Sequence, residues 1–164
     1  MSWFREVLAL VTLDRVEREI ILLLQQDGRM PYVEMAQRTG VSEGTIRRKF
    51  NRLKEEGVIN IVGVANPFKI GFNTVAIIGL RVQQKMLEQA ARKLSSMPAV
   101  RYVAASTGTH DIIIQVCLED NQQLSDFLLR QLPEVEGIIA SDTSVVLKIY
   151  KQTYDWGVPL RGVS

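Results

Sequence analysis

Apolar residues recur at intervals of three and four in three segments of the first 60 residues, which predicts three helices. The first covers residues 14–26, where Asp14 and Glu17 have the spacing of a capping box. The second covers residues 32–39, and a tight turn joins it to the third. Three helices of which the last two are joined by a short turn containing glycine predict a helix-turn-helix.

The third helix separates its residues by polarity. Ser42 is a suitable N-cap, while Ile46, Phe50 and Leu53 form an apolar stripe and Gly57 ends the helix. Polar and cationic residues lie outside that stripe: Arg47, Arg48, Asn51 and Arg52. For this helix alone, a solvated charged face is the simpler interpretation. The helix-turn-helix context reverses that preference, because the second helix of such a pair enters the major groove of DNA.

From Phe72 the apolar residues follow a different pattern, of strands alternating with helices. Strands are expected at residues 74–82, 100–106, 112–118 and 138–150, and helices at 86–97 and 124–132. The order β-α-β-β-α-β predicts a ferredoxin-like fold, so the whole chain is of the α+β class. A short β-branched segment, residues 58–64, predicts a connecting strand before this domain.

These patterns divide the chain into four parts. A helix-turn-helix domain is expected over residues 1–60, of which residues 1–12 form an N-terminal arm. Residues 61–71 form a hinge, residues 72–150 a ferredoxin-like ligand-binding and oligomerisation domain, and residues 151–164 a C-terminal tail.

The expected sheet also indicates self-association. Both helices of a split β-α-β pair cover one face and leave the other open, yet Ile112-Ile113-Ile114 and Val145-Val146-Leu147 place apolar side chains on both faces. Soluble proteins rarely expose such a patch, which predicts a two-fold dimer. A dimer also suits a helix-turn-helix, which usually binds paired half-sites.

Composition narrows the possible functions. The 164 residues carry a net charge of only +2, so nucleic-acid binding must rest on a local basic patch. One cysteine and one histidine leave no cluster for structural zinc, and no metal or other cofactor is expected. Cys117 lies in an apolar strand, where packing is favoured over redox chemistry. No signal peptide and no run of about 18 apolar residues is seen, so a cytoplasmic protein without membrane segments is expected.

The chain resembles the Lrp/AsnC (feast/famine) family of transcription regulators over nearly its whole length. The resemblance is carried by these residues: Leu13-Asp14-Arg15, Asp27-Gly28-Arg29, Glu34 to Ser42, Thr45, Arg48, Arg52-Leu53, Glu55-Glu56-Gly57, Ile59 and Gly108-Thr109-His110-Asp111. It implies a winged or hinge-linked DNA-binding domain, dimers built through the sheets that often assemble into octamers, and an amino acid or similar effector bound near a G-x-x-D loop. Two positions depart from the family: Pro31 replaces a frequent serine cap, and His110 replaces a frequent aromatic residue.

The candidate DNA-contacting residues lie mainly on the third helix: Tyr32, Ser42, Glu43, Gly44, Thr45, Arg47, Arg48, Asn51 and Arg52. Arginine is the best bidentate partner for guanine. Not all of the arginines can face the groove, and Arg48 is favoured over Arg52. Gly44 permits close backbone approach. Tyr32 could contact a phosphate, although packing is an equally good interpretation.

The candidate effector-binding residues, implied by the resemblance, form one loop: Thr107, Gly108, Thr109, His110 and Asp111. Gly108 also fits an ordinary hairpin turn. Asp111 could bind a ligand's ammonium group or cap the turn through its backbone amides. His110 could sense pH, but a surface histidine without function is the simpler interpretation.

The sequence therefore predicts a sequence-specific DNA-binding transcription regulator without catalytic residues. Its expected partners are double-stranded DNA, an amino acid or similar effector, and further copies of itself. One alternative is an architectural DNA-binding protein without an effector. Another is an enzyme like the siroheme decarboxylases, which share the two-domain architecture but use extra histidines that this chain lacks.

Overall fold

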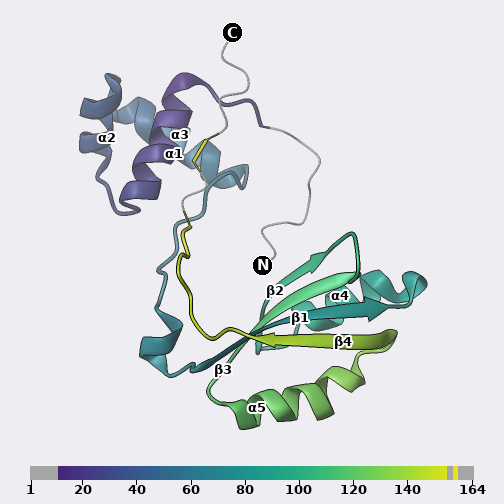
Figure 1. Cartoon of the computed structure of the whole chain (residues 1–164). Helices are drawn as coiled ribbons and strands as arrows, with labels where there is room; N and C mark the ends of the chain where they lie inside the picture. Colours follow the sequence, from purple (N-terminus) through teal and green to yellow (C-terminus); the bar gives the residue numbers. More distant parts are fainter. Residues whose placement is uncertain (1–10, 155–156, 159–164) are drawn as a thin grey trace. The chain divides into compact units, whose positions relative to one another are not determined.

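The computed structural model describes residues 11–154 and 157–158, which fold as two compact units (Figure 1). The division falls between Gly63 and Val64 and again between Tyr150 and Lys151. The described residues after Tyr150 therefore belong to the N-terminal unit. Most of the expected N-terminal arm lies outside the described residues.

The N-terminal unit is a three-helix domain. It contains α1 (Arg15–Gln26), α2 (Tyr32–Thr39) and α3 (Glu43–Glu55), as the apolar spacing predicts. Ile20, Met35, Ile46 and Leu53 are fully buried between the helices. After the chain returns to this unit, Val158 packs against the same core, and the Gln25 side chain donates a hydrogen bond of 3.4 Å to the Gly157 carbonyl.

The helix ends follow the expected capping chemistry. Asp14 accepts a hydrogen bond from the Glu17 amide, and the Glu17 carboxylate accepts one from the Asp14 amide, both at 2.9 Å. At α3, the Ser42 hydroxyl accepts from the Thr45 amide at 3.2 Å. Gly57, at φ +69°, closes α3 in a Schellman arrangement, a left-handed backbone that favours glycine.

The strand expected over residues 58–64 is wrong, since no strand forms there. The Val58 and Ile59 amides instead donate to the Leu53 carbonyl at the end of α3, and Ile59 is buried in the helical core. Val62 and Val64 are exposed. β-branched residues favour strands only where a neighbouring strand pairs with them, and the described residues provide no such neighbour.

The C-terminal unit has the predicted β-α-β-β-α-β order. Its elements are β1 (Thr74–Val82), α4 (Leu87–Ser95), β2 (Val100–Ala105), β3 (Ile112–Leu118), α5 (Asn121–Asp126) and β4 (Ile138–Val145). Short 3₁₀ helices at Pro67–Ile70 and Gln84–Met86 precede β1 and α4. The four strands form one antiparallel sheet in the order β2-β3-β1-β4, as in ferredoxin-like folds.

The helix expected at residues 124–132 is divided in the structure. After α5 the chain continues as a π turn over Phe127–Gln131 and a 3₁₀ turn over Leu132–Glu134. Pro133 has no amide proton to donate and cannot continue an α-helix. The apolar spacing remains effective despite this change, since Leu124, Phe127 and Leu132 are all buried against the sheet.

Both helices pack on one face of the sheet (Figure 1). Alternation along β1 buries Ala76, Ile78 and Leu80 on that face and directs Ile77 to the opposite, open face, where it is 38% exposed. Strand pairing then places Tyr102, Ile113, Gln115, Asp142 and Ser144 on the open face as well.

The predicted apolar surface is therefore partly wrong. β4 ends at Val145, and Leu147 beyond it is 96% exposed in a segment without strand structure. β4 contributes the polar residues Asp142 and Ser144 to the open face, where the exposed or half-buried apolar side chains include Ile77, Tyr102, Ile113 and Cys117. Burial raises the pKa of the Cys117 thiol, while the charge of Arg101 acts in the opposite direction.

Candidate DNA-contacting helix and effector loop

The outer face of α3 lies opposite the residues that it buries. At about 100° per residue, Arg48 lies about 200° around the helix from buried Ile46, so it points away from the core. Gly44 lies one turn before it, and Asn51 and Arg52 lie about one turn after it on the same side. All four are exposed.

Arg48 forms no hydrogen bond or ion pair with any residue that the structure describes. A Cβ atom added at Gly44 would meet only the Ser42 hydroxyl, at 4.0 Å, so the protein itself does not require glycine at that position. Both observations describe a surface that is free to receive a partner. Ser42 and Thr45 close the tip, with their hydroxyl oxygens 2.9 Å apart.

Arg47 is partly engaged within the protein. Its guanidinium lies 3.4 Å from the Glu43 carboxylate and 5.7 Å from the centre of the Tyr32 ring. Tyr32 in turn packs against Phe50, with ring centres 5.3 Å apart. Of the two interpretations of Tyr32, the structure therefore shows packing within the domain.

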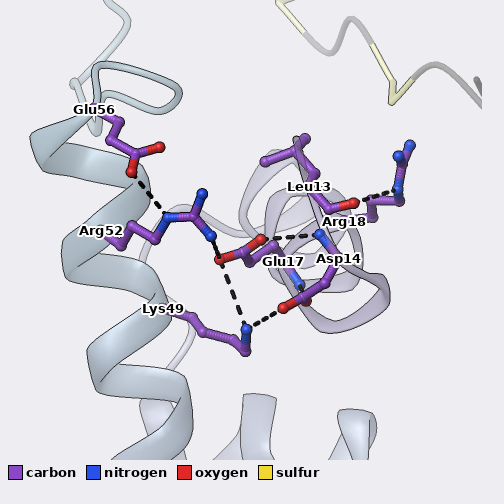
Figure 2. A network of polar contacts seen from close by, with 7 residues as sticks. All are labelled: Leu13, Asp14, Glu17, Arg18, Lys49, Arg52 and Glu56. Carbon is purple, nitrogen blue, oxygen red and sulfur yellow. Dashed lines mark hydrogen bonds and ion pairs between the residues drawn. The ribbon is translucent and has the colours of Figure 1, made fainter. Parts of the chain in front are cut away.

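Arg52 belongs to a cluster of charged groups between α3 and α1 (Figure 2). Its Nη1 donates to Glu17 Oε1 at 2.8 Å, and its Nε donates to Glu56 Oε1 at 2.9 Å. Lys49 pairs with Asp14 and lies 3.7 Å from Glu17 Oε1. The side chain of Glu17 is 1% exposed, so this carboxylate is buried between two cations.

The cluster stabilises the charged forms of Asp14 and Arg52. Burial alone would raise the pKa of Asp14, but hydrogen bonds from Lys49 and the Glu17 amide, with the charge of Lys49, lower it below the ordinary value of 3.8. The hydrogen bond to Glu56, together with the charge of Glu17, raises the pKa of Arg52. Both shifts stabilise the charged forms at neutral pH.

The candidate effector residues form the loop between β2 and β3. Gly108 adopts φ +104°, a conformation that favours glycine, while Thr107 and Thr109 are exposed. Two contacts of Ser106 close the loop: its hydroxyl donates to the His110 carbonyl at 2.7 Å, and its amide donates to the Asp111 carbonyl at 2.9 Å.

Asp111 joins this loop to the neighbouring strand β1. Its Oδ2 accepts a hydrogen bond of 2.7 Å from the Val82 amide, and its own amide donates to the Leu80 carbonyl at 2.8 Å. The Asp111 carboxylate therefore binds an amide of the neighbouring strand and not an amide within its own turn. One carboxylate oxygen of Asp111 is consumed by this structural contact.

His110 lies across Gly79 on the open face of the sheet. A Cβ atom at Gly79 would be 2.5 Å from the His110 ring, so the ring occupies the space that only glycine leaves. The His110 Nε2 lies 4.0 Å from the carboxylate of Asp142, the strand partner of Gly79. His110 is therefore packed on the sheet, not free in solvent.

Sequence reasoning missed three residues of these sites. Glu17 was interpreted only as a capping residue, and Ser106 and Asp142 were not noticed. The spacing of Glu17 and Arg52 contains no signal for their pairing, because they lie on different helices. Among the described residues, no group of three or more His, Cys, Asp or Glu side chains could hold a metal, and no helix there is long and apolar enough to cross a membrane.

Two family profiles match the two units. A profile described as "Winged helix-turn-helix DNA-binding" matches residues 13–60, and one described as "Lrp/AsnC ligand binding domain" matches residues 75–156. The chain is 39% identical over 145 residues to an uncharacterized HTH-type transcriptional regulator of Pyrococcus horikoshii, a match covering 88% of this chain and 92% of the relative. HTH-type transcriptional regulator FL11 of Pyrococcus furiosus is 34% identical, with coverages of 86% and 93%.

Solved structures of similar fold are also transcriptional regulators. A transcriptional regulator of Neisseria meningitidis in complex with L-Met superposes with a TM-score of 0.81 at 27% identity, covering 92% of this chain and 98% of that one. AsnC of E. coli gives a TM-score of 0.79 at 26% identity, with coverages of 87% and 97%.

Proposed function

Because the chain belongs to the Lrp/AsnC family of transcriptional regulators, we propose that it recognises specific DNA sites with α3 and responds to an amino acid bound near the loop at residues 107–111. The chain is a regulator with a DNA-binding helix-turn-helix and a ligand-binding domain. Its relatives are named as transcriptional regulators and not as enzymes, so the decarboxylase alternative is dropped. A cytoplasmic location is part of the proposal.

The observation that carries the DNA-reading proposal is the free guanidinium of Arg48. It projects from the face of α3 opposite the core and has no partner among the described residues. Gly44, one helical turn before Arg48, has no side chain that would keep the backbone of α3 away from DNA. In the proposed complex Arg48 reads a base edge, the first turn of α3 (Ser42, Glu43, Gly44 and Thr45) lies against the groove, and Asn51 lies beside Arg48.

The test is the variant Arg48→Ala, measured by fluorescence anisotropy on a duplex that the wild-type protein selects from a random pool. We expect the affinity to fall at least tenfold at physiological salt with no change in melting temperature, because the lost side chain contacts only DNA. Arg92→Ala is the control, since it removes the same charge from an exposed position in the other unit. Unchanged affinity in Arg48→Ala would contradict the proposal.

Two findings support an amino-acid effector. The family profile over residues 75–156 is described as a ligand-binding domain, and the similar Neisseria regulator was solved with L-Met. In this chain Thr107, Thr109, His110 and the free oxygen of Asp111 supply polar groups suited to an amino acid's charged ends. His110 in place of a common aromatic residue separates this chain from other members of the family, so its preferred amino acid is expected to differ from theirs.

The effector is tested by melting the full chain with each of the twenty amino acids. A ligand that binds only the folded protein raises the melting temperature, and it does so more at higher concentration. We expect a shift with at least one amino acid and its loss in Thr109→Val. If none of the twenty shifts the melting temperature while DNA binding is intact, the architectural alternative is favoured instead.

The proposed assembly is a dimer through the open face of the sheet, with octamers as a further possibility of the family. Ile77, Tyr102 and Ile113 supply apolar area at this face. Paired α3 helices would then bind paired half-sites on double-stranded DNA.

A further inference from the structure

The helix α3 carries four cations in its first three turns, but they are not equivalent. Arg47 pairs with Glu43 of its own helix, and Arg48 has no partner among the described residues. The side chains of Lys49 and Arg52 instead reach toward α1 (Figure 2). Their partner there is the buried carboxylate of Glu17, whose side chain is 1% exposed. An unpaired buried carboxylate is costly, so Glu17 strongly favours keeping these cations in place.

Glu17 uses its two oxygens for two different helices. Its Oε2 accepts the Asp14 amide at 2.9 Å and so caps α1. Its Oε1 accepts from Arg52 of α3 at 2.8 Å and lies 3.7 Å from Lys49. A single carboxylate therefore links the capped start of α1 to two cations of α3.

We propose that Glu17 is a specificity-determining and positioning residue for DNA recognition: it holds Arg52 against α1, away from the phosphates, and thereby presents Arg48 and Gly44 to the groove. The inference rests on α3 being the groove-reading helix proposed above. Arg52 lies one turn after Arg48 on the same side of α3 and is 45% exposed. Without Glu17, its only other partner among the described residues is Glu56 at the end of the same helix, and this exposed pair turns outward together. Lys49 remains held by Asp14 even then.

An arginine released in this way would bind DNA without regard to sequence. A phosphate contact strengthens binding to every duplex and steepens the dependence of affinity on salt, whereas base contacts set the preference for one sequence. Glu17 thus limits the number of phosphate contacts by an internal ion pair. It acts on DNA only through Arg52 and the orientation of α3.

The test uses Glu17→Gln in the full chain. Glutamine at this position still caps α1 through its carbonyl oxygen, but it no longer provides a negative charge for Arg52. Binding is measured over a range of salt concentrations on the selected duplex and on poly(dI-dC). The matched control is Glu19→Gln, which removes the same charge from the same helix but breaks only the pair with Arg15, at 2.7 Å.

We expect Glu17→Gln to bind poly(dI-dC) at least roughly tenfold more tightly at about 50 mM salt, since one added phosphate contact in each protomer steepens the log–log salt slope by about 0.9 per bound protomer. The ratio of specific to nonspecific affinity falls accordingly. The double variant Glu17→Gln/Arg52→Ala restores the wild-type slope, because the released cation is gone. A merely structural role would weaken binding to both duplexes and leave the slope unsteepened, and that result would overturn the proposal.

Arg52→Ala provides a second test if Glu17→Gln does not fold. We expect its salt slope and its affinity for the selected duplex to equal those of the wild type within about twofold. Arg52 touches no DNA in the proposed complex, and Lys49 still joins α3 to Asp14 and Glu17. A slope shallower by about 0.9 per bound protomer would show that Arg52 contacts phosphate and would refute the inference. Arg48→Ala distinguishes failure of the Glu17 inference from failure of the proposed function. If Arg48→Ala leaves the affinity for DNA unchanged, the proposed DNA-reading role of α3 is wrong.

Discussion

At the scale of single residues, Gly44 is placed where the protein gains nothing from glycine. It lies in the first turn of α3 with an ordinary negative φ, and its surroundings leave room for a side chain. Glycine within a helix costs about 0.5–1 kcal/mol relative to alanine. Such a cost is expected where a partner must approach the backbone closely.

Gly44→Ala is therefore expected to stabilise the protein and weaken DNA binding. The free energy of unfolding in urea rises by about 0.5–1 kcal/mol, while the affinity for the selected duplex falls roughly tenfold. Gly63→Ala is the control, because a Cβ atom there meets nothing within 4 Å and the residue lies outside α3. A more stable Gly44→Ala protein with full affinity would show that DNA does not approach this position.

At the scale of elements, the effector loop and β1 form one packed unit. Asp111 binds the Val82 amide, and the His110 ring fills the space beside Gly79. The His110 ring of the loop therefore leaves no room for a side chain at position 79 of β1. A ligand that moves His110 would also change the packing of the open face of the sheet.

This coupling is measurable in a double-mutant cycle. Gly79→Ala would place its Cβ 2.5 Å from the His110 ring and is expected to destabilise the protein by about 1–3 kcal/mol, a typical cost of overpacking. In the His110→Ala background the same change should cost much less, because the ring is absent. Urea unfolding of the four proteins gives the interaction energy, and an additive result would mean that the ring moves aside freely.

At the scale of the whole molecule, the open face of the sheet determines assembly in our proposal. Ile77 is 38% exposed at its centre, bordered by the polar residues Gln115, Asp142 and Ser144. A mixed surface of this kind suits an interface with an apolar centre and a polar rim. It is a weaker basis for dimerisation than the continuous apolar surface expected from the sequence.

Ile77→Lys is expected to dissociate the assembly, because a lysine at the centre of an apolar contact would be buried without a partner. Light scattering coupled to size exclusion should give at least twice the protomer mass of 18.5 kDa for the wild type and the protomer mass for the variant. Leu129→Lys is the control and should leave the mass unchanged. Leu129 is 74% exposed in the turn Phe127–Gln131, which follows α5 and lies away from the open face. Equal masses for all three proteins would rule this face out as the interface.

Local interactions explain why so much of the fold could be predicted from the sequence. The capping box at Asp14, the Ser42 cap, the left-handed Gly57 and the alternation along β1 each depend on residues a few positions apart. These short-range patterns were sufficient for the order of helices and strands in both units. They were not sufficient at residues 58–64, where the β-branched residues have no pairing strand, nor beyond Val145, where β4 ends.

Some features of the candidate sites follow from the local sequence, and others depend on tertiary contacts. The sequence alone determined that α3 has a cationic outer face and that residues 107–111 form a loop after β2, because helical period and a glycine turn are local properties. Only the tertiary structure decided that Arg52 is held by Glu17 while Arg48 is free, and that His110 lies on Gly79. The physical reason is that an ion pair or a ring contact depends on distance in space, and the packing of α1 against α3 brings together charges that lie 35 positions apart in the chain.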